Sequence, residues 1–241
     1  MNEIESGRTT AISIVIPAYQ HARELPACLD SVFGQAYRDF EVIVVDDGST
    51  DGTEETLRPF LSRLTYIRQE NRGANAARNR GYREACGRLV LFCDADIVMK
   101  PDCLEKMVRA LELRSDAAYA YCSFMYGWKK FRLWPFDPAR LRRMNYIHTT
   151  SLIRREHFPG FDESIRKLQD WDLWLTMLER GQSGTWIPEY LFVAIPHLGG
   201  ISTWVPGIFY RIPWIRLGLR MRAVERFREA EAIIKEKHHL N

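Results

Sequence analysis

Short apolar runs recur in the first half of the chain, and an acidic or turn-forming residue follows each of them. The runs are residues 12–16, 41–45 and 89–93. They consist mainly of β-branched and other apolar residues without polar alternation, and they end at Pro17, Asp46 and Asp94. Continuous runs of this length are typical of strands that are buried on both faces, as in a parallel sheet.

Segments with helical periodicity lie between these runs. One apolar stripe follows the helical spacing: Leu25, Cys28, Leu29, Val32 and Phe33. Asp51 with Glu54 resembles a capping box that opens a helix through Leu57 and Leu61, which Pro59 interrupts. The small residues Ala77, Gly81 and Ala85 predict a closely packed helix face, and Pro101 suits the first turn of a further helix.

This alternation predicts an α/β doubly wound, mixed and mostly parallel sheet with flanking helices. Residues 12–122 form its first half, and a second, less regular half covers 123–203 within a single domain of residues 1–203. Residues 204–241 are predicted as a C-terminal helical extension. Its last part, 223–241, presents apolar residues at helical spacing and a Glu231–Lys235 pair.

Composition narrows the class of protein. The chain has 241 residues, of which 46% are hydrophobic and 27% charged, with a net charge of +3. This balance excludes a disordered chain and a protein that coats nucleic acid. Five cysteines without a CxxC pair indicate a reducing compartment. The absence of a leader-like start and of a long apolar run predicts a cytoplasmic location.

Carboxylates gather where two of the apolar runs end. Asp46 and Asp47 follow one run, and Asp94 and Asp96 follow another. Ligands of open α/β sheets bind at the carboxyl ends of strands, where these side chains would meet. Oxygen ligands of this kind suit Mg²⁺ or Mn²⁺. Taken singly, each group could also be an ordinary turn or strand-end cap.

The chain resembles family 2 glycosyltransferases of the GT-A fold over residues 12–203. The matching segments, in the order of the family, are 15–20, 44–53, 71–73, 76–79, 94–96, 151–155, 160–162 and 169–175. Two departures are Gln169, where the family usually has Glu, and Gln20, where it often has Asn. The first predicts an altered acceptor contact rather than inactivity.

The resemblance implies a role for each matching residue. Pro17, Ala18, Tyr19, Asp47, Arg78 and Asp94 would bind the nucleotide, with Asp47 accepting a hydrogen bond from a uracil or thymine N–H and Asp94 near the ribose or the metal. Asp96 and His197 would bind the metal that bridges the diphosphate. Asp170 would be the general base, with Gln169 and Trp171 on the acceptor side. Asp172 would cap or brace its helix, and the other histidines would be structural or exposed.

These roles predict an inverting, metal-dependent hexosyltransferase that moves a sugar from a UDP- or dTDP-type donor to a hydroxyl acceptor in polysaccharide or glycolipid synthesis. The metal would offset charge on the leaving diphosphate, and a carboxylate would deprotonate the acceptor. The alternative is a sugar-nucleotide-binding or scaffolding protein with a decayed site. A nucleotidyltransferase and a dehydrogenase are disfavoured because no Gly-rich loop follows the first strand.

Aromatic and basic residues are mixed in two segments, 124–147 and 204–222. This mixture is typical of residues at a lipid headgroup boundary, so we expect peripheral contact with the inner face of a membrane. Two prolines, Pro206 and Pro213, interrupt the second segment, and its cations do not share one helical face. A tail packed back on the domain is therefore the competing interpretation.

Overall fold

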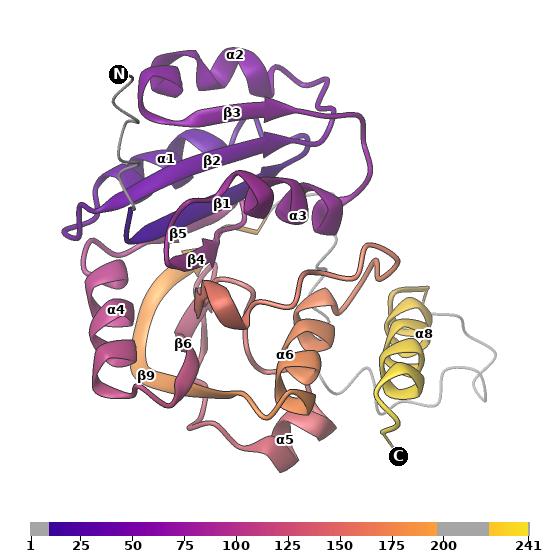
Figure 1. Cartoon of the computed structure of the whole chain (residues 1–241). Helices are drawn as coiled ribbons and strands as arrows, with labels where there is room; N and C mark the ends of the chain where they lie inside the picture. The colour runs from indigo at the N-terminus through magenta and orange to yellow at the C-terminus, as the bar shows by residue number, and fades with distance from the viewer. Residues whose placement is uncertain (1–9, 197–221, 241) are drawn as a thin grey trace, which may run out of the picture.

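The computed structural model describes residues 10–196 and 222–240, and it contains one curled sheet with helices on both faces (Figure 1). The strands are β1 (Ile12–Ala18), β2 (Phe40–Asp46), β3 (Thr65–Arg68), β4 (Leu89–Phe92), β5 (Ile97–Met99), β6 (Ala117–Tyr126), β7 (Lys129–Phe131), β8 (Leu152–Arg154) and β9 (Ser183–Ala194). The helices are α1 (Leu25–Phe33), α2 (Thr53–Leu57), α3 (Ala74–Glu84), α4 (Cys103–Leu113), α5 (Pro138–Arg143), α6 (Gln169–Glu179) and α8 (Arg222–Lys237), with 3₁₀ turns η1 (Arg58–Arg63) and η2 (Arg155–His157).

The strand order is β3-β2-β1-β4-β8-β6-β9-β5, and β7 pairs with β6. Strands β2, β1 and β4 are parallel, as the apolar runs predict, and β3, which no apolar run predicts, is parallel to β2. Strand β8 then runs antiparallel between β4 and β6, and β9 is parallel to β6. The carboxyl ends of β1, β2, β4 and β6 therefore lie on the same side of the sheet.

The central strand β1 is buried on both faces because helices cover each of them. Ile12, Ile14 and Ile16 belong to the core under α1 and α4, whereas Val15 faces the opposite side. Gly81 of α3 lies against that side, where an added Cβ would overlap Val15 Cγ1. The small-residue face of α3 is thus confirmed as a close contact with the sheet.

Helix α8 lies outside α6, away from strands β1–β3 (Figure 1). Val224 and Ile234 are buried, and Glu231 pairs with Lys235 at 3.0 Å, as the sequence predicts. Two residues at its end reach α6. Lys237 Nζ lies 2.7 Å from Asp172 Oδ1, and His238 Nε2 lies 2.9 Å from the same oxygen.

The predicted helix after Asp51 is shorter than expected. Helix α2 ends at Leu57, and Pro59 stands in the 3₁₀ turn η1 that follows. Asp51 Oδ1 accepts hydrogen bonds from the Thr53 N–H (3.1 Å) and hydroxyl (2.5 Å), while Gly52 occupies the N-cap position. The predicted capping box is therefore wrong in detail, because the Asp51 side chain bonds Thr53 within its own turn.

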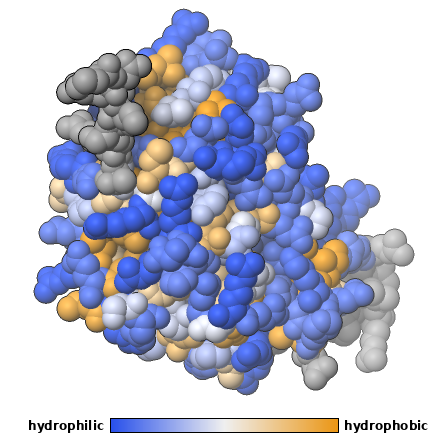
Figure 2. Space-filling view, viewed as in Figure 1, coloured by the Kyte–Doolittle hydropathy of each residue, from blue (hydrophilic) through white to orange (hydrophobic). Residues whose placement is uncertain are grey.

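The face seen in Figure 2 is mainly hydrophilic, with apolar residues scattered among charged ones. In the described part of the chain, no helix has both the length and the apolar character needed to cross a bilayer.

Candidate nucleotide and sugar site

A cavity of about 410 Å³ opens at the carboxyl ends of the parallel strands. Its walls combine the ends of β1, β2, β4 and β6 with the first turns of α3 and α6. The lining residues are Pro17, Ala18, Tyr19, His21, Asp47, Asn71, Gly73, Ala74, Ala77, Arg78, Asp94, Ala95, Asp96, Tyr126, Arg166 and Gln169. The structure thus brings together predicted residues from five separate segments of the sequence.

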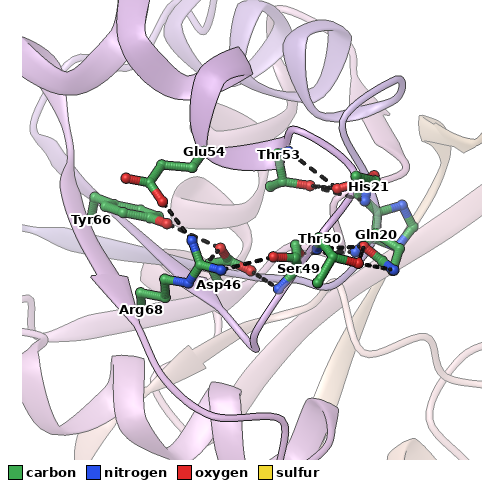
Figure 3. Close-up of polar contacts among 10 residues, drawn as sticks. Gln20, His21, Asp46, Ser49, Thr50, Thr53, Glu54, Tyr66 and Arg68 are labelled. Atoms are coloured by element: carbon green, nitrogen blue, oxygen red, sulfur yellow. Dashed lines mark hydrogen bonds and ion pairs between the residues drawn. The ribbon is translucent and has the colours of Figure 1, made fainter.

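Hydrogen bonds join the two loops that follow β1 and β2 (Figure 3). The Gln20 backbone N–H donates to Ser49 Oγ at 3.0 Å, and the Gln20 carboxamide exchanges hydrogen bonds with Thr50. Gln20 adopts a left-handed backbone with φ of 59°. The amide at this position therefore holds the loop around Tyr19 against the second strand end.

The two adjacent carboxylates after β2 have different tasks. Asp46 is fully buried and accepts hydrogen bonds from the Ser49 N–H (2.8 Å) and the Tyr66 hydroxyl (3.0 Å), so it braces the strand end (Figure 3). Asp47 lines the cavity. It accepts from the Gln69 amide and the backbone N–H groups of Arg72 and Gly73 at 2.7–2.9 Å.

These contacts leave Asp47 room for one more donor. Its Oδ1 accepts two hydrogen bonds, whereas Oδ2 accepts one, from Gly73. A carboxylate has about four acceptor positions. A ligand N–H in the cavity therefore has a free lone pair to meet.

Arg78 and Asp94 form an ion pair at the floor of the cavity. Arg78 Nη2 donates to Asp94 Oδ1 at 2.6 Å, and Nη1 donates to Asn75 Oδ1 at 3.1 Å. Burial raises the pKa of Asp94, but the charges of Arg78 and His148 and the Arg78 hydrogen bond outweigh it and lower that pKa. Among the described residues, Arg78 Nε is buried and has no hydrogen-bond partner.

The residues for a divalent ion are Asp96 and, next to it, Asp94. Asp96 lines the cavity, as does Tyr126. Burial of Tyr126 raises the pKa of its hydroxyl, and the negative charge of Asp96 raises that pKa further. Within residues 10–196 and 222–240, no group of three or more His, Cys, Asp or Glu side chains could hold a metal alone. Mg²⁺ and similar ions are commonly held by one or two carboxylates together with substrate phosphates, which this arrangement fits. His197 lies outside the described residues.

One long loop, residues 160–168, forms the wall opposite the strand ends. Asn75 and Asn79 of α3 donate to its backbone carbonyls, at Asp162 and Phe161, over 2.7–2.8 Å. Arg166 Nη1 donates to the Arg72 carbonyl at 3.1 Å. Gly73 has a φ of 96° and lies under this guanidinium, where a Cβ would overlap it.

Helix α6 carries the predicted base, Asp170, next to a residue of the cavity but not among the lining residues. Gln169 lines the cavity, and Asp170 follows it, half-buried, with its Oδ1 accepting from the Trp171 N–H at 3.0 Å. His148 is close to both Asp94 and Asp170, because both charges act on it. Burial lowers the pKa of His148, and the two carboxylates oppose that change only in part. Its Nδ1 accepts from the Thr150 N–H at 3.0 Å, which leaves the ring proton on Nε2.

The prediction that Trp171 contacts an acceptor needs correction. Its side chain is 2% exposed, and its indole N–H donates to the Leu141 carbonyl at 2.6 Å. Trp171 therefore packs in the core under α6 and does not line the cavity. Asp172 makes no N-cap hydrogen bond for α6; it is buried and binds the end of α8.

Several cavity residues were not predicted as site residues. The sequence predicts that His21 is structural or exposed, and Arg166 carries no signal because it stands alone in an irregular loop. Tyr126 belongs to the aromatic and basic segment 124–147, but nothing in the sequence separates it from its neighbours. Asn71 and Gly73 lie in a matched segment whose function was not assigned.

Comparisons with known proteins agree on the family. The model of glycosyl transferase family 2 matches residues 13–167. Glycosyltransferase GlyA of Streptococcus pneumoniae is 38% identical over 118 residues, which are 47% of this chain and 17% of that protein. The uncharacterized glycosyltransferase YibD of Escherichia coli is 33% identical over 118 residues, or 48% and 34% of the two chains. The chain therefore matches only a part of these relatives.

Two solved structures have a similar fold. Staphylococcus aureus TarS (residues 1–349), in complex with UDP-GlcNAc, aligns with a TM-score of 0.67 at 17% identity, over 83% of this chain and 64% of that one. The mannosyltransferase PcManGT of Pyrobaculum calidifontis, in complex with GDP-Man and Mn²⁺, aligns with a TM-score of 0.64 at 24% identity, over 78% and 58%. The fold is thus that of GT-A glycosyltransferases. Since the family model matches residues 13–167, more than half of the chain, the chain belongs to glycosyl transferase family 2.

Proposed function

We propose that the protein is an inverting, metal-dependent glycosyltransferase that uses a UDP- or dTDP-type sugar donor and a hydroxyl acceptor. One observation carries this proposal. A single cavity gathers Asp47, Arg78, Asp94 and Asp96, and Asp170 directly follows the cavity residue Gln169 on a separate helix. The two similar structures, which are complexes with UDP-GlcNAc and with GDP-Man, support a nucleotide sugar as the donor.

The donor would enter with its base against the ends of β1 and β2. Tyr19 is 47% exposed at the cavity and offers a ring face for stacking. The free lone pair of Asp47 Oδ2 can accept a hydrogen bond from the N3–H of uracil or thymine. A neutral, apolar side chain at this position could not accept that hydrogen bond. The diphosphate would then lie near Arg78 and the first turn of α3, whose backbone dipole favours anions.

A divalent ion at Asp96, when bound, supplies positive charge that offsets the charge on the departing diphosphate. Arg78 adds a fixed cation on the same side, and its pairing with Asp94 keeps the guanidinium in place before the donor arrives. The chain's own residues thereby hold the leaving group at the strand ends.

Asp170 would act from the other side of the sugar. Its carboxylate accepts the proton of the acceptor hydroxyl, the acceptor oxygen bonds to the anomeric carbon, and the bond from that carbon to the diphosphate oxygen breaks. A base within about 3 Å of the hydroxyl contributes strongly to such a step. Attack opposite the leaving group inverts the anomeric centre. Gln169, which lines the cavity beside this base, would contact the acceptor.

The alternative is a protein that binds sugar nucleotides without turnover, as a scaffold. Retention of the cavity carboxylates together with the partly exposed Asp170 argues against such decay, because an unused carboxylate near Asp94 would only add repulsion. Hydrolysis of UDP-sugars in the presence of Mn²⁺ distinguishes the two: the transferase releases UDP slowly even without acceptor, and the scaffold does not.

Calorimetric titration of UDP tests the donor site. We expect Mn²⁺ to tighten UDP binding clearly over the same titration with chelator. Asp96→Ala should abolish the gain and leave the melting temperature unchanged, since the Asp96 side chain lines the cavity and is not part of the apolar core. Asp102→Ala is the matched control, because that carboxylate pairs with Lys106 outside the cavity. Equal UDP affinity with Mn²⁺ and with chelator would refute the proposal.

A further inference from the structure

A second cavity lies beside the donor cavity, between the loop 160–168 and α8. Its volume is about 250 Å³. The lining residues are Ser164, Ile165, Arg166, Lys167, Arg226, Glu229, Ala230 and Ile233. Arg166 also lines the donor cavity, so one guanidinium stands between the two spaces.

Cations outnumber anions in this second cavity. Arg166, Lys167 and Arg226 contribute three positive charges, and Glu229 contributes one negative charge. Two neighbouring cations are neutralised at short range, since Lys237 has Asp162 and Asp172, and Arg72 has Glu163. In the described part of the chain, neither Lys167 nor Arg226 has a carboxylate within ion-pair distance.

The rest of the lining is apolar. Ile165 and Ala230 are nearly buried and form the floor, while Ile233 is 55% exposed at one side. Two guanidinium groups and one ammonium group around an apolar floor suit a phosphoryl group attached to a carbon skeleton. Guanidinium binds phosphate through paired N–H donors. A ligand with a single carboxylate would need fewer than three cations to offset its charge.

The cavity's place in the chain relates it to the transfer reaction. Lys167 precedes Asp170 by three residues on the same loop-to-helix segment, and Gln169 lies between them. Because Arg166 lines both cavities, a ligand held by Lys167 and Arg226 would lie next to the donor cavity.

We propose that this cavity is the acceptor subsite and that it binds a phosphoryl group of the acceptor. This inference rests on the proposed function and makes it more specific: the acceptor is a phosphate ester with a free hydroxyl. The phosphate is either part of a soluble or polymeric ester or the headgroup of a lipid, since both present the same chemistry to these cations.

Titration with sn-glycerol 3-phosphate tests the subsite, with the donor cavity first saturated by UDP and Mn²⁺. Glycerol, which lacks the phosphate, is the control ligand. We expect binding of the phosphate ester alone. Arg226→Gln and Lys167→Gln should each raise its Kd about tenfold, the factor that one charge-assisted hydrogen bond contributes. Lys235→Gln, on the same helix but paired with Glu231, should leave the Kd unchanged.

The outcomes separate this inference from the proposed function. If UDP and Mn²⁺ bind but the phosphate ester does not, or if both variants bind it as well as the wild type, the subsite is refuted and the donor site stands. If UDP does not bind, the proposed function is refuted, and titration of the ester alone then tests the subsite.

A second experiment uses vesicles of phosphatidate in phosphatidylcholine. Loss of vesicle binding in Arg226→Gln, with weak binding of the soluble ester, would identify a lipid headgroup as the source of the phosphate.

Discussion

Asp170 and Asp172 stand two positions apart on α6, yet their surroundings differ. Asp170 is half-buried beside the cavity residue Gln169, and within the described residues the Trp171 N–H is the one hydrogen-bond donor to its carboxylate. Asp172 has 5% of its side chain exposed and accepts from two cationic groups of the C-terminal helix. One carboxylate is thus available to a substrate, and the other is committed to the fold.

Replacing Asp170 should affect turnover and little else. In Asp170→Asn the side chain keeps its shape but can no longer accept a proton. We expect hydrolysis of the donor, and transfer once the acceptor is known, to fall by about 10²-fold or more. UDP affinity and melting temperature should stay at the wild-type values. Asp116→Asn is the control, since Asp116 pairs with Arg114 on the surface. Near-normal transfer by Asp170→Asn would show that another group is the base.

Replacing Asp172 should affect stability first. Asp172→Asn removes the negative charge between Lys237 and His238 and leaves both cations facing a neutral amide in a buried place. We expect a loss of about 2 kcal/mol in the free energy of unfolding, as for other buried charge-assisted hydrogen bonds. Urea unfolding monitored by circular dichroism measures this loss. A change within about 0.5 kcal/mol, the range of surface substitutions, would contradict the contact with α8.

Among the elements, those predicted most accurately have both faces buried. Strands β1, β2 and β4 end within two residues of the predicted runs, because a continuous apolar run indicates a buried strand without information about distant partners. Helix α2 is shorter than predicted because Pro59 follows it, and the Asp51 side chain bonds its own turn. Strand β9 is long and pairs with β6 through register shifts, which no local pattern encodes.

The packing of α3 on the sheet gives an element-scale test. In Gly81→Ala the new methyl group would overlap Val15 Cγ1 and approach Val45 Cγ2 at 3.2 Å. Alanine favours helix more than glycine does, so a surface glycine would gain stability from this change. Here we expect a net loss of about 1–3 kcal/mol from overpacking, measured by denaturant unfolding. Arg80→Ala, one position earlier on the exposed face, is the control. An increase in stability would mean that α3 does not pack closely at Gly81.

The docking of α8 should depend on pH through His238. Burial lowers the pKa of His238, but its hydrogen bonds and charge interactions with Asp172 and Glu179 outweigh burial and raise it above the usual value. A raised pKa means that the folded state binds the proton more tightly. The stabilisation is therefore complete below the unfolded pKa of about 6.5 and is lost as pH rises through the folded pKa.

Thermal unfolding of wild type and His238→Gln from acidic to alkaline pH measures this effect. The groups facing the imidazole are Asp172 and Glu179 of α6, with Lys237 next to it on its own segment. We expect the wild type to exceed the variant most at the acidic end of that range and the difference to shrink steadily toward the alkaline end. A difference that grows with pH would show that His238 is held in its neutral form.

At the scale of the molecule, the sequence predicts the side of the cavity that the strand ends build. Parallel strands bring Asp47, Asp94 and Asp96 to one edge without further information. The opposite wall could not be predicted, because hydrogen bonds from Asn75 and Asn79 hold a loop more than 80 positions away in the sequence. The second cavity has the same origin, since it forms only where this loop meets α8.

The segment 124–147 gives the molecule one surface with both aromatic and basic residues. Trp128 at the β6–β7 turn is 90% exposed, and Trp134 and Met144 are 40% and 44% exposed. The cations of this segment are Lys129, Lys130, Arg132, Arg140, Arg142 and Arg143. Tyr126, two residues before Trp128, lines the donor cavity, so this surface begins at the cavity. The other predicted membrane segment, 204–222, lies outside the described residues except for its last position.

We expect this surface to bind anionic membranes. An indole ring at the headgroup boundary and cations near anionic lipids both favour binding, and each Lys or Arg near the surface contributes about 1 kcal/mol. Co-sedimentation should therefore be stronger with phosphatidylglycerol vesicles than with phosphatidylcholine vesicles, and it should weaken as added salt screens the charges.

Trp128→Ser and the double variant Lys129→Gln with Lys130→Gln should each bind less. Leu113→Ser is the control, because Leu113 is 74% exposed at the end of α4, outside this segment. Equal binding to both vesicle types, or an effect of Leu113→Ser as large as that of Trp128→Ser, would refute a membrane contact at this surface and leave Trp128 as an isolated exposed residue.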